Sequence, residues 1–476
     1  MNAPSAGNLR LPALRIDAAG RRRVDMRAVI ALAVPLVANS SVQAVLNLTD
    51  TWFVGRLSAQ ALAAMGVVYW LTIVVILLLG GAALAVQTFV AQAYGAGDRL
   101  RAAHAAWNGL WVALATAPLF VVTAYAGPWL LRPFGLAPEI RDAALQFWAP
   151  RMLGGPFAVA LWALTGFFNG VGRTGVTLAV MSFSAVLNAA LNQAFIFGLG
   201  WGVAGAGWAT TVSTGVAVLL TGALLSSRTL DRDFPTRASM AFDRRLAANL
   251  LRTGIPMGLF PSIDVGALAV FQLMLSGVGT VDGAASQIVM MLTSLAYLPT
   301  IGFALAGTTL VGQSIGAGNR DWAARVGNAT VRMCVGYMGM VSVFLALAGP
   351  WLLPLFIHAH DATAAEVVAL GRTLLWFAAG YQIFDGLNLG AGFCLRGAGD
   401  MRVPTLMIVC LAWFGFVPLA HMAIFPPGQG WLPWLPRLGY GAAGGWAAAL
   451  LYTCALGTLV WLRWRSGAWR RIELPR

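Results

Sequence analysis

Val90-Ala-Gln-Ala-Tyr-Gly-Ala-Gly-Asp-Arg99 recurs, 221 residues later, as Val311-Gly-Gln-Ser-Ile-Gly-Ala-Gly-Asn-Arg320. Three further pairs of stretches follow in the same order: Ala126-Gly-Pro-Trp-Leu-Leu131 with Ala348-Gly-Pro-Trp-Leu-Leu353, Phe168-Asn-Gly-Val-Gly-Arg173 with Leu395-Arg-Gly-Ala-Gly-Asp400, and residues 199–208 with 438–446. Chance would not give four matches in one order at similar shifts. The chain therefore contains two homologous halves.

The chain is too apolar for a soluble protein. Of its 476 residues, 59% are hydrophobic and 10% are charged, and the mean hydropathy is +0.75. Apolar runs recur along the whole length, and an α-helix needs about 20 such residues to cross the hydrocarbon core of a bilayer. Runs such as Leu71 to Leu84 do not alternate as the strands of a membrane β-barrel would. The sequence predicts an integral membrane protein built from helices.

Glycine, proline and charge clusters divide the chain into about twelve spans, half of them in each repeat. Because each repeat has an even number of spans, both enter the membrane from the same side. We predict an all-α membrane fold of twelve transmembrane helices in two pseudo-symmetric six-helix lobes, with the substrate between them. The predicted parts are a cytoplasmic N-terminal tail (1–27), a first lobe (28–226), a cytoplasmic linker (227–247), a second lobe (248–464) and a cytoplasmic C-terminal tail (465–476).

The net charge of +14 comes from arginines that flank the spans. Positively charged flanks stay in the cytoplasm. The tails, the linker and alternate loops carry the denser set, whereas the opposite loops carry a thinner one: Arg56, Arg132, Arg141, Arg151 and Arg437. We expect a multi-pass protein of the bacterial inner membrane, surrounded by lipid, with both termini in the cytoplasm and no nucleic-acid partner.

Three acids, Asp50, Asp264 and Asp385, fall well inside apolar spans. A charge at the centre of a membrane helix costs about 2.5 to 3.5 kcal/mol on insertion scales, and such residues mark ion or substrate pathways. No arginine lies deep in the same spans, and the candidate partner is Arg56, at the outer end of the span that contains Asp50. We expect the three acids to be protonated or to hold a cation.

Asp385 lies one helical turn after Tyr381, so the carboxylate and the phenol face the same way. Carboxylate oxygens are hard ligands for a small cation such as Na⁺, and a tyrosine ring attracts a nearby cation. Asp264 provides a second acid from another helix, and coupled acids let a proton compete with that cation. A purely structural role for Asp264 and Asp385, as acids hydrogen-bonded within the lobe, stays open.

Asp50, Asn188 and Asn192 are the candidates for proton or substrate coupling in the first lobe. Asn188 and Asn192 are spaced i, i+4 and share a helix face, where asparagines often hydrogen-bond between packed helices. Asp50 lies near the end of its span, five residues before Gly55. Structural roles for all three stay open beside the functional ones.

The sequence carries no arrangement typical of an enzyme. None of the glycine-rich turns follows a strand or carries the lysine of a phosphate-binding loop, and no nucleophile stands with a base. We therefore predict no catalysis, no ATPase module, and no cofactor or metal beyond a possible Na⁺ at Asp264, Tyr381 and Asp385. Any uphill transport must use a gradient of Na⁺ or H⁺.

Several motifs, taken as a set, identify a resemblance. They are Pro35 with Asp50, the Gly-Ala-Gly turn after Gln92, Pro256 with Asp264, Asn188 with Asn192, Gly202-Val-Ala-Gly205, and Tyr381 and Asp385 with Leu395-Arg-Gly-Ala-Gly-Asp400. Over residues 28–465 the chain resembles the multidrug and toxic compound extrusion (MATE) family, and within it the NorM-type branch. One departure is Asp264, where that branch usually has Glu. Asn192 stands where the related DinF-type branch has Asp, which argues against a coupling site built only in the first lobe.

The resemblance implies an antiporter that exports organic cations or amphipathic drugs in exchange for Na⁺ or H⁺ by alternating access of two lobes. It implies a cation site at Asp264, Tyr381 and Asp385, with Asp50 as the coupling acid of the first lobe. We expect a monomer. The alternative is a lipid-linked oligosaccharide flippase of the same superfamily, whose polyanionic substrate calls for arginines in the cavity, whereas the deep charges here are acidic.

Overall fold

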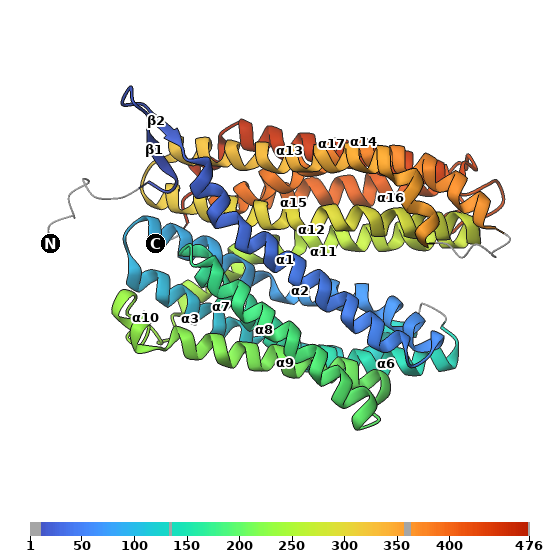
Figure 1. The fold of residues 1–476 in the computed structure, drawn as a ribbon, viewed down its shortest axis with the longest axis horizontal. Coiled ribbons are helices and arrows are strands. Elements are labelled where there is room, and N and C mark those ends of the chain that lie inside the picture. The colour runs from blue at the N-terminus through green and yellow to red at the C-terminus, as the bar shows by residue number, and fades with distance from the viewer. Residues whose placement is uncertain (1–10, 133–135, 357–362, 475–476) are drawn as a thin grey trace.

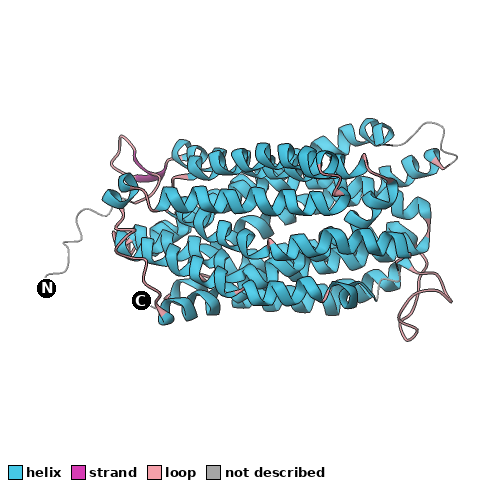
Figure 2. Ribbon diagram, turned by 90° about the horizontal axis from the view of Figure 1, so that it is seen from below, coloured by secondary structure: helices cyan, strands magenta, loops and turns pink. Residues whose placement is uncertain are grey.

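The computed structural model describes residues 11–132, 136–356 and 363–474, and these form two helical bundles that lie side by side (Figure 1). Nearly all of this part of the chain is helical, and two short strands lie at one end (Figure 2). Eleven of the described helices are long and apolar enough to cross a membrane, and a bent pair of helices supplies a twelfth span. The predicted all-α membrane fold is confirmed.

The described part of the first lobe contains nine α-helices and one π-helix. In chain order they are α1 (Met26–Gly55), α2 (Ala59–Gly95), α3 (Arg99–Ala115), α4 (Ala117–Tyr125), α5 (Gly127–Leu131), α6 (Pro138–Leu153), α7 (Gly155–Gly170), α8 (Thr174–Asn192), the π-helix η2 (Gln193–Gly198) and α9 (Gly202–Leu225). The linker to the second lobe includes the short helix α10 (Arg228–Asp233).

The second lobe repeats this plan. Its helices are α11 (Arg244–Val278), α12 (Thr280–Gly316), α13 (Arg320–Leu352) with the 3₁₀ turn η3 (Leu353–Phe356), α14 (Ala364–Ala398), α15 (Arg402–Val409), the π-helix η4 (Cys410–Phe416), α16 (Val417–Ile424), α17 (Gly441–Arg465) and the 3₁₀ turn η5 (Ala468–Arg471). Each lobe contains one π-helix: η2 ends its span, whereas η4 lies in the middle of its span and is followed by α16.

The fourth span is broken where α6 meets α7 at an angle of 44°. Pro156 begins α7 without a backbone N–H to donate into the preceding turn. Gly154, at the junction, lies against Thr211 of α9, and the Thr211 hydroxyl donates to the Pro150 carbonyl at 2.8 Å. A side chain from a neighbouring helix thus supports the backbone at the bend, which agrees with how kinks are satisfied in membranes.

The sequence repeat is also visible in the backbone. Gly97 and Gly318, which end the repeated stretch, have φ of 78° and 75°. Gly172 and Gly399, in the second repeated motif, both have φ of 82°. Glycine adopts these left-handed conformations without the steric cost that a side chain brings. The four tight turns at this end of the molecule are therefore two pairs of copies.

The lobes approach closely through glycines. Gly81 of α2 lies against the backbone of Gly254 and Gly258 in α11, and Gly302 of α12 lies against the backbone of Val37 in α1. Gly81 with Gly302, and Val37 with Gly258, are related by the repeat shift of 221 residues. A Cβ atom at position 81 or 302 would overlap the facing helix, so these glycines permit the lobes to pack.

Four reciprocal hydrogen bonds join the lobes near the repeated turns. Gln92 of the first lobe donates from Nε2 to the Gly397 carbonyl at 3.0 Å, and its repeat partner Gln313 donates to the Gly170 carbonyl at 2.8 Å. The other two bonds are likewise copies of each other: the Thr88 hydroxyl to the Arg396 carbonyl at 3.0 Å, and the Thr309 hydroxyl to the Asn169 carbonyl at 2.9 Å. We call these eight residues the reciprocal clasp.

Two segments outside the spans pack at the same end as the clasp. Strands β1 (Leu14–Ile16) and β2 (Arg22–Val24) form an antiparallel hairpin against the second lobe, where the Trp322 indole of α13 donates to the Pro12 carbonyl at 2.8 Å. The linker after α10 packs on the first lobe, where the Trp107 indole donates to the Thr236 carbonyl at 2.8 Å. Part of the predicted N-terminal tail is therefore folded.

The reciprocal clasp should set how tightly this end is closed. Replacing both Gln92 and Gln313 by Ala removes two partly buried interlobe hydrogen bonds, each worth about 0.5 to 1.5 kcal/mol. The population open at this end should rise accordingly, which spin-label distances between α3 and α13 can measure. Gln60→Ala, an exposed change on the same helix as Gln92, should leave those distances unchanged. Unchanged distances in the double variant would contradict a closing role.

Candidate functional site

The structure brings the three predicted residues of the second lobe into one cluster. Asp264 lies on α11, and Tyr381 and Asp385 lie on α14. The carboxylates of Asp264 and Asp385 are close enough to interact electrostatically, and Asp385 also interacts with the Tyr381 hydroxyl. Like charges this close, in a medium of low dielectric constant, favour neutralisation by a proton or by a cation.

Two tyrosines complete the cluster. The Tyr452 hydroxyl of α17 donates to Oδ1 of Asp264 at 2.7 Å, and Tyr297 of α12 interacts electrostatically with both Asp264 and Asp385. Sequence reasoning missed both residues because neither lies in a repeated motif or beside an acid along the chain. The rarity of tyrosine, with 8 in the chain against 24 phenylalanines, was the available signal. Four helices therefore contribute to this cluster.

Aromatic stacking fixes the orientation of the phenols. Tyr381 stacks on Trp446 with ring centroids 6.3 Å apart and an interplanar angle of 17°. Tyr452 stacks on Phe416 at 4.8 Å and 19°. The Trp446 indole in turn donates to the Ser286 hydroxyl at 3.1 Å. The cluster is an oxygen-rich site with apolar walls, a setting in which electrostatic interactions are stronger than in water.

Asn388 adds a further oxygen one turn after Asp385. Its side chain is hydrogen-bonded to the Asp385 carboxylate, and it is 5% exposed. Its Oδ1 atom has no hydrogen-bond partner in the described structure. A buried acceptor without a donor is costly, and a bound cation would satisfy it. The donor set of carboxylate, amide and phenol oxygens fits Na⁺ or a proton.

In the first lobe, the structure joins Asp50, Asn188 and Asn192 in one network. Asn192 of α8 donates from Nδ2 to Oδ1 of Asp50 at 2.6 Å and also to Oδ1 of Asn188 at 3.1 Å. The Thr210 hydroxyl of α9 lies 3.2 Å from Oδ2 of Asp50, and Asn188 donates to Thr210 at 3.3 Å. Asp50 is 6% exposed, and both asparagines are fully buried. Three helices thus meet at one carboxylate.

Arg151 is a correction to the sequence analysis, which placed it in a loop and expected Arg56 near Asp50. Arg151 lies inside α6 and interacts electrostatically with Asp50 and Tyr69. Thr210 and Thr211, adjacent on α9, contact Asp50 and the carbonyl of Pro150 respectively, which brings α6 beside the carboxylate.

Arg56 has a different environment. Its guanidinium lies over the ring of Trp52 at 5.1 Å and over the ring of Phe197 at 5.7 Å. Cation–π contacts of this kind suit the water-facing end of a span. Arg151 is therefore the basic residue that interacts electrostatically with Asp50, so the first lobe places an acid near a base. The second lobe places an acid near another acid.

Comparison with known proteins decides the family. The MatE family model matches residues 35–193 and 263–420, one region in each lobe. The chain belongs to the MATE family. Each matched region contains one member of three of the four repeated pairs, so the two lobes are two copies of one family unit. A MATE protein is a membrane transporter and not an enzyme, as the sequence predicts.

Similar MATE proteins span nearly the whole chain. The "Probable multidrug resistance protein NorM" of Pseudomonas aeruginosa is 30% identical over 93% of this chain and 90% of its own length. The protein of the same name from Pseudomonas putida is 31% identical over 93% and 95%. A solved structure described as "MATE in the straight conformation" aligns with a TM-score of 0.80 at 22% identity, over 93% of this chain and 96% of that one. The resemblance to the NorM-like branch is confirmed.

The pairing of Asp50 with Arg151 can be tested by a double-mutant cycle. Groups that interact through a shared network show coupling energies of about 0.5 to 3 kcal/mol. Asp50→Asn and Arg151→Gln should therefore be non-additive in the free energy of unfolding, measured in detergent. Asp50→Asn with Arg56→Gln should be additive. Additivity in the first cycle, or coupling in the second, would show that Arg151 is not the partner.

Proposed function

We propose that this protein is a secondary active multidrug efflux antiporter, which exports organic cations or amphipathic drugs in exchange for Na⁺ or H⁺. The observation that carries the proposal is the pair of acids Asp264 and Asp385, held in one oxygen-rich cluster of the second lobe. The names of its NorM relatives support drugs as the substrate class. The cluster supports an ion as the coupling partner.

The coupling ion binds at Asp264, Tyr381 and Asp385 in this proposal. The ion neutralises two carboxylates that repel each other, so its binding stabilises the arrangement of α11 and α14 in which they are close. Emptying the site favours the arrangement in which they are separated. Coupling requires that the ion has different affinities for the two arrangements, and the repulsion between Asp264 and Asp385 provides that difference.

Asp50, Asn188 and Asn192 form the coupling site of the first lobe in this proposal. The Asp50 carboxylate has Arg151 as a counter-charge and hydrogen bonds from Asn192 and Thr210. A proton that binds Asp50 weakens these hydrogen bonds and leaves the Arg151 guanidinium without its nearest acid. α1, α6, α8 and α9 then rearrange together, which alters the surface that the first lobe offers to a drug.

The orientation proposed from the arginines gives the direction of access. The reciprocal clasp lies at the same end as the N-terminal hairpin and the linker, which we assign to the cytoplasm. In this proposal the lobes are therefore closed toward the cytoplasm, and access to the sites is from the outer side. One chain contains both lobes and both sites, so a monomer is sufficient for the transport cycle.

Drug transport in vesicles tests the proposal. Asp385→Asn should abolish the dependence of efflux on an imposed Na⁺ or pH gradient and slow net transport of a fluorescent cation by at least about tenfold, since it removes a charge that the ion needs. Glu366→Gln on the same helix, where the side chain is exposed, is the control and should transport normally. Imposing the two gradients separately identifies the ion. Gradient-driven efflux by Asp385→Asn equal to that of the parent would refute the second-lobe site.

A further inference from the structure

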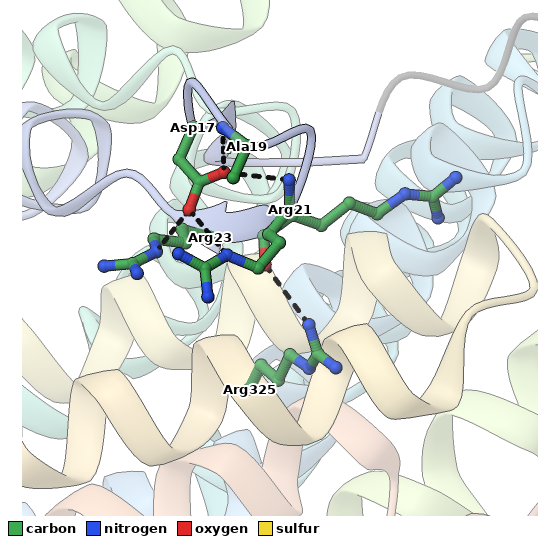
Figure 3. A network of polar contacts seen from close by, with 6 residues as sticks. Asp17, Ala19, Arg21, Arg23 and Arg325 are labelled. Carbon is green, nitrogen blue, oxygen red and sulfur yellow. Dashed lines mark hydrogen bonds and ion pairs between the residues drawn. The ribbon is translucent and has the colours of Figure 1, made fainter.

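The N-terminal hairpin carries more positive charge than it neutralises. Between residues 15 and 27 there are five arginines and two aspartates. Arg15 and Arg23 stand directly opposite each other on the paired strands, and like charges in that position repel. Asp17 accepts from the side chains of Arg21 at 3.2 Å and Arg23 at 2.9 Å (Figure 3). The negative charge of Asp17 is therefore shared by a surface with four exposed arginines: Arg15, Arg21, Arg22 and Arg23.

The hairpin is held in one orientation by the second lobe. The Arg325 guanidinium of α13 donates to the Arg22 carbonyl at 3.3 Å (Figure 3), and Leu14 and Val24 pack against the apolar core of that lobe. Hydrogen bonds from the backbone of Arg21 hold the pKa of Asp17 below its ordinary value, so its carboxylate stays ionised in the turn. A solvated tail that only signals topology would need none of these contacts.

The attachment point lies on the lipid-facing side of α13. Four large apolar residues form an exposed stripe with helical spacing on this helix: Met340, Val343, Phe344 and Leu347. Such a stripe on a membrane helix faces the acyl chains. Arg325 lies five turns before Val343 on the same face, a distance of about 27 Å at the rise of an α-helix. Arg332, two turns after Arg325 on the same face, is also exposed, and arginines on a lipid-facing helix lie at the headgroups or in the water. The hydrocarbon core therefore begins after Arg332, and Arg325 lies on the headgroup side of that boundary.

The hairpin therefore overhangs the bilayer next to α13. In Figure 1 it extends past the outer edge of the bundle beside the start of α13. Ile16, near the turn of the hairpin, is 63% exposed, which places an apolar side chain among the arginines. Basic groups with an apolar side chain at this depth match the interface of a membrane whose headgroups are anionic.

We propose that the hairpin of residues 14–24 is a binding site for anionic phospholipid headgroups. The guanidinium groups of Arg15, Arg22 and Arg23 contact the lipid phosphates, and Ile16 inserts between the headgroups. Because α1 belongs to the first lobe while the hairpin is anchored to α13 of the second, bound lipid stabilises the existing attachment of the start of α1 to the second lobe. This site is separate from the ion and drug sites and does not depend on the function proposed above.

The test compares lipid retention by variants of the whole chain. Arg15→Gln with Arg22→Gln removes two exposed guanidinium groups and leaves Arg21 and Arg23 on Asp17, so the hairpin keeps its fold. Native mass spectrometry in detergent would follow binding of phosphatidylglycerol and, separately, of phosphatidylcholine. An arginine near an anionic surface is worth about fivefold in affinity. The double variant should therefore hold phosphatidylglycerol at least about tenfold more weakly and phosphatidylcholine as the parent does.

The matched control removes the same charge elsewhere at this end of the protein. Arg228 and Arg232 on α10 are exposed, and Arg228→Gln with Arg232→Gln should leave phosphatidylglycerol binding within about twofold of the parent, well below the fivefold value of one contacting arginine. Hydrogen exchange of residues 14–24 in phosphatidylcholine micelles verifies the fold of the hairpin. If the double variant loses that protection, the single variant Arg22→Gln tests the proposal instead. It should bind phosphatidylglycerol about fivefold more weakly than the parent. Parental affinity in the hairpin variants, or an equal loss in the control, overturns the proposal.

Discussion

The reciprocal clasp is the contact on which the arrangement of the two lobes depends. Each lobe offers one glutamine and one threonine from a long helix, and each receives the corresponding pair from the other lobe at its backbone carbonyls. The two lobes are copies related by a pseudo-two-fold axis, so both use the same surface for this contact. That one surface only has to be complementary to itself. The glycines at 81 and 302 allow the helices to approach closely enough for this contact.

The two lobes share one backbone plan but differ in their buried charged residues. The clasp and the glycine turns are duplicated, but the polar sites are not. The second lobe places Asp264 near Asp385, where two like charges repel each other. The first lobe places Asp50 beside Arg151, whose guanidinium already supplies the positive charge. We infer that the second lobe responds to the ion gradient, and that the first responds to protonation and to the drug.

Much of the fold could be predicted from the sequence because membrane spans and tight turns leave local signals. Runs of apolar residues, repeated glycine turns and arginine flanks each depend on neighbours along the chain. The acids Asp264 and Asp385 were found in the same way, since a charge inside an apolar run is conspicuous. The contributions of Tyr452 and Arg151 could not be predicted, because each depends on which helix face packs against a distant span. The folded N-terminal hairpin was missed because arginines dominate its strands.

Ion release on drug binding tests the central claim most directly, because an antiporter must bind drug and ion reciprocally. A cationic substrate added to the detergent-solubilised protein, loaded with isotopic Na⁺ or in lightly buffered solution with a pH indicator, should release Na⁺ or H⁺ in proportion to the drug bound. The variant with Asp264→Asn and Asp385→Asn should bind drug without this release. Equal release from the parent and the variant, or drug binding by the parent with no release of either ion, would contradict the account.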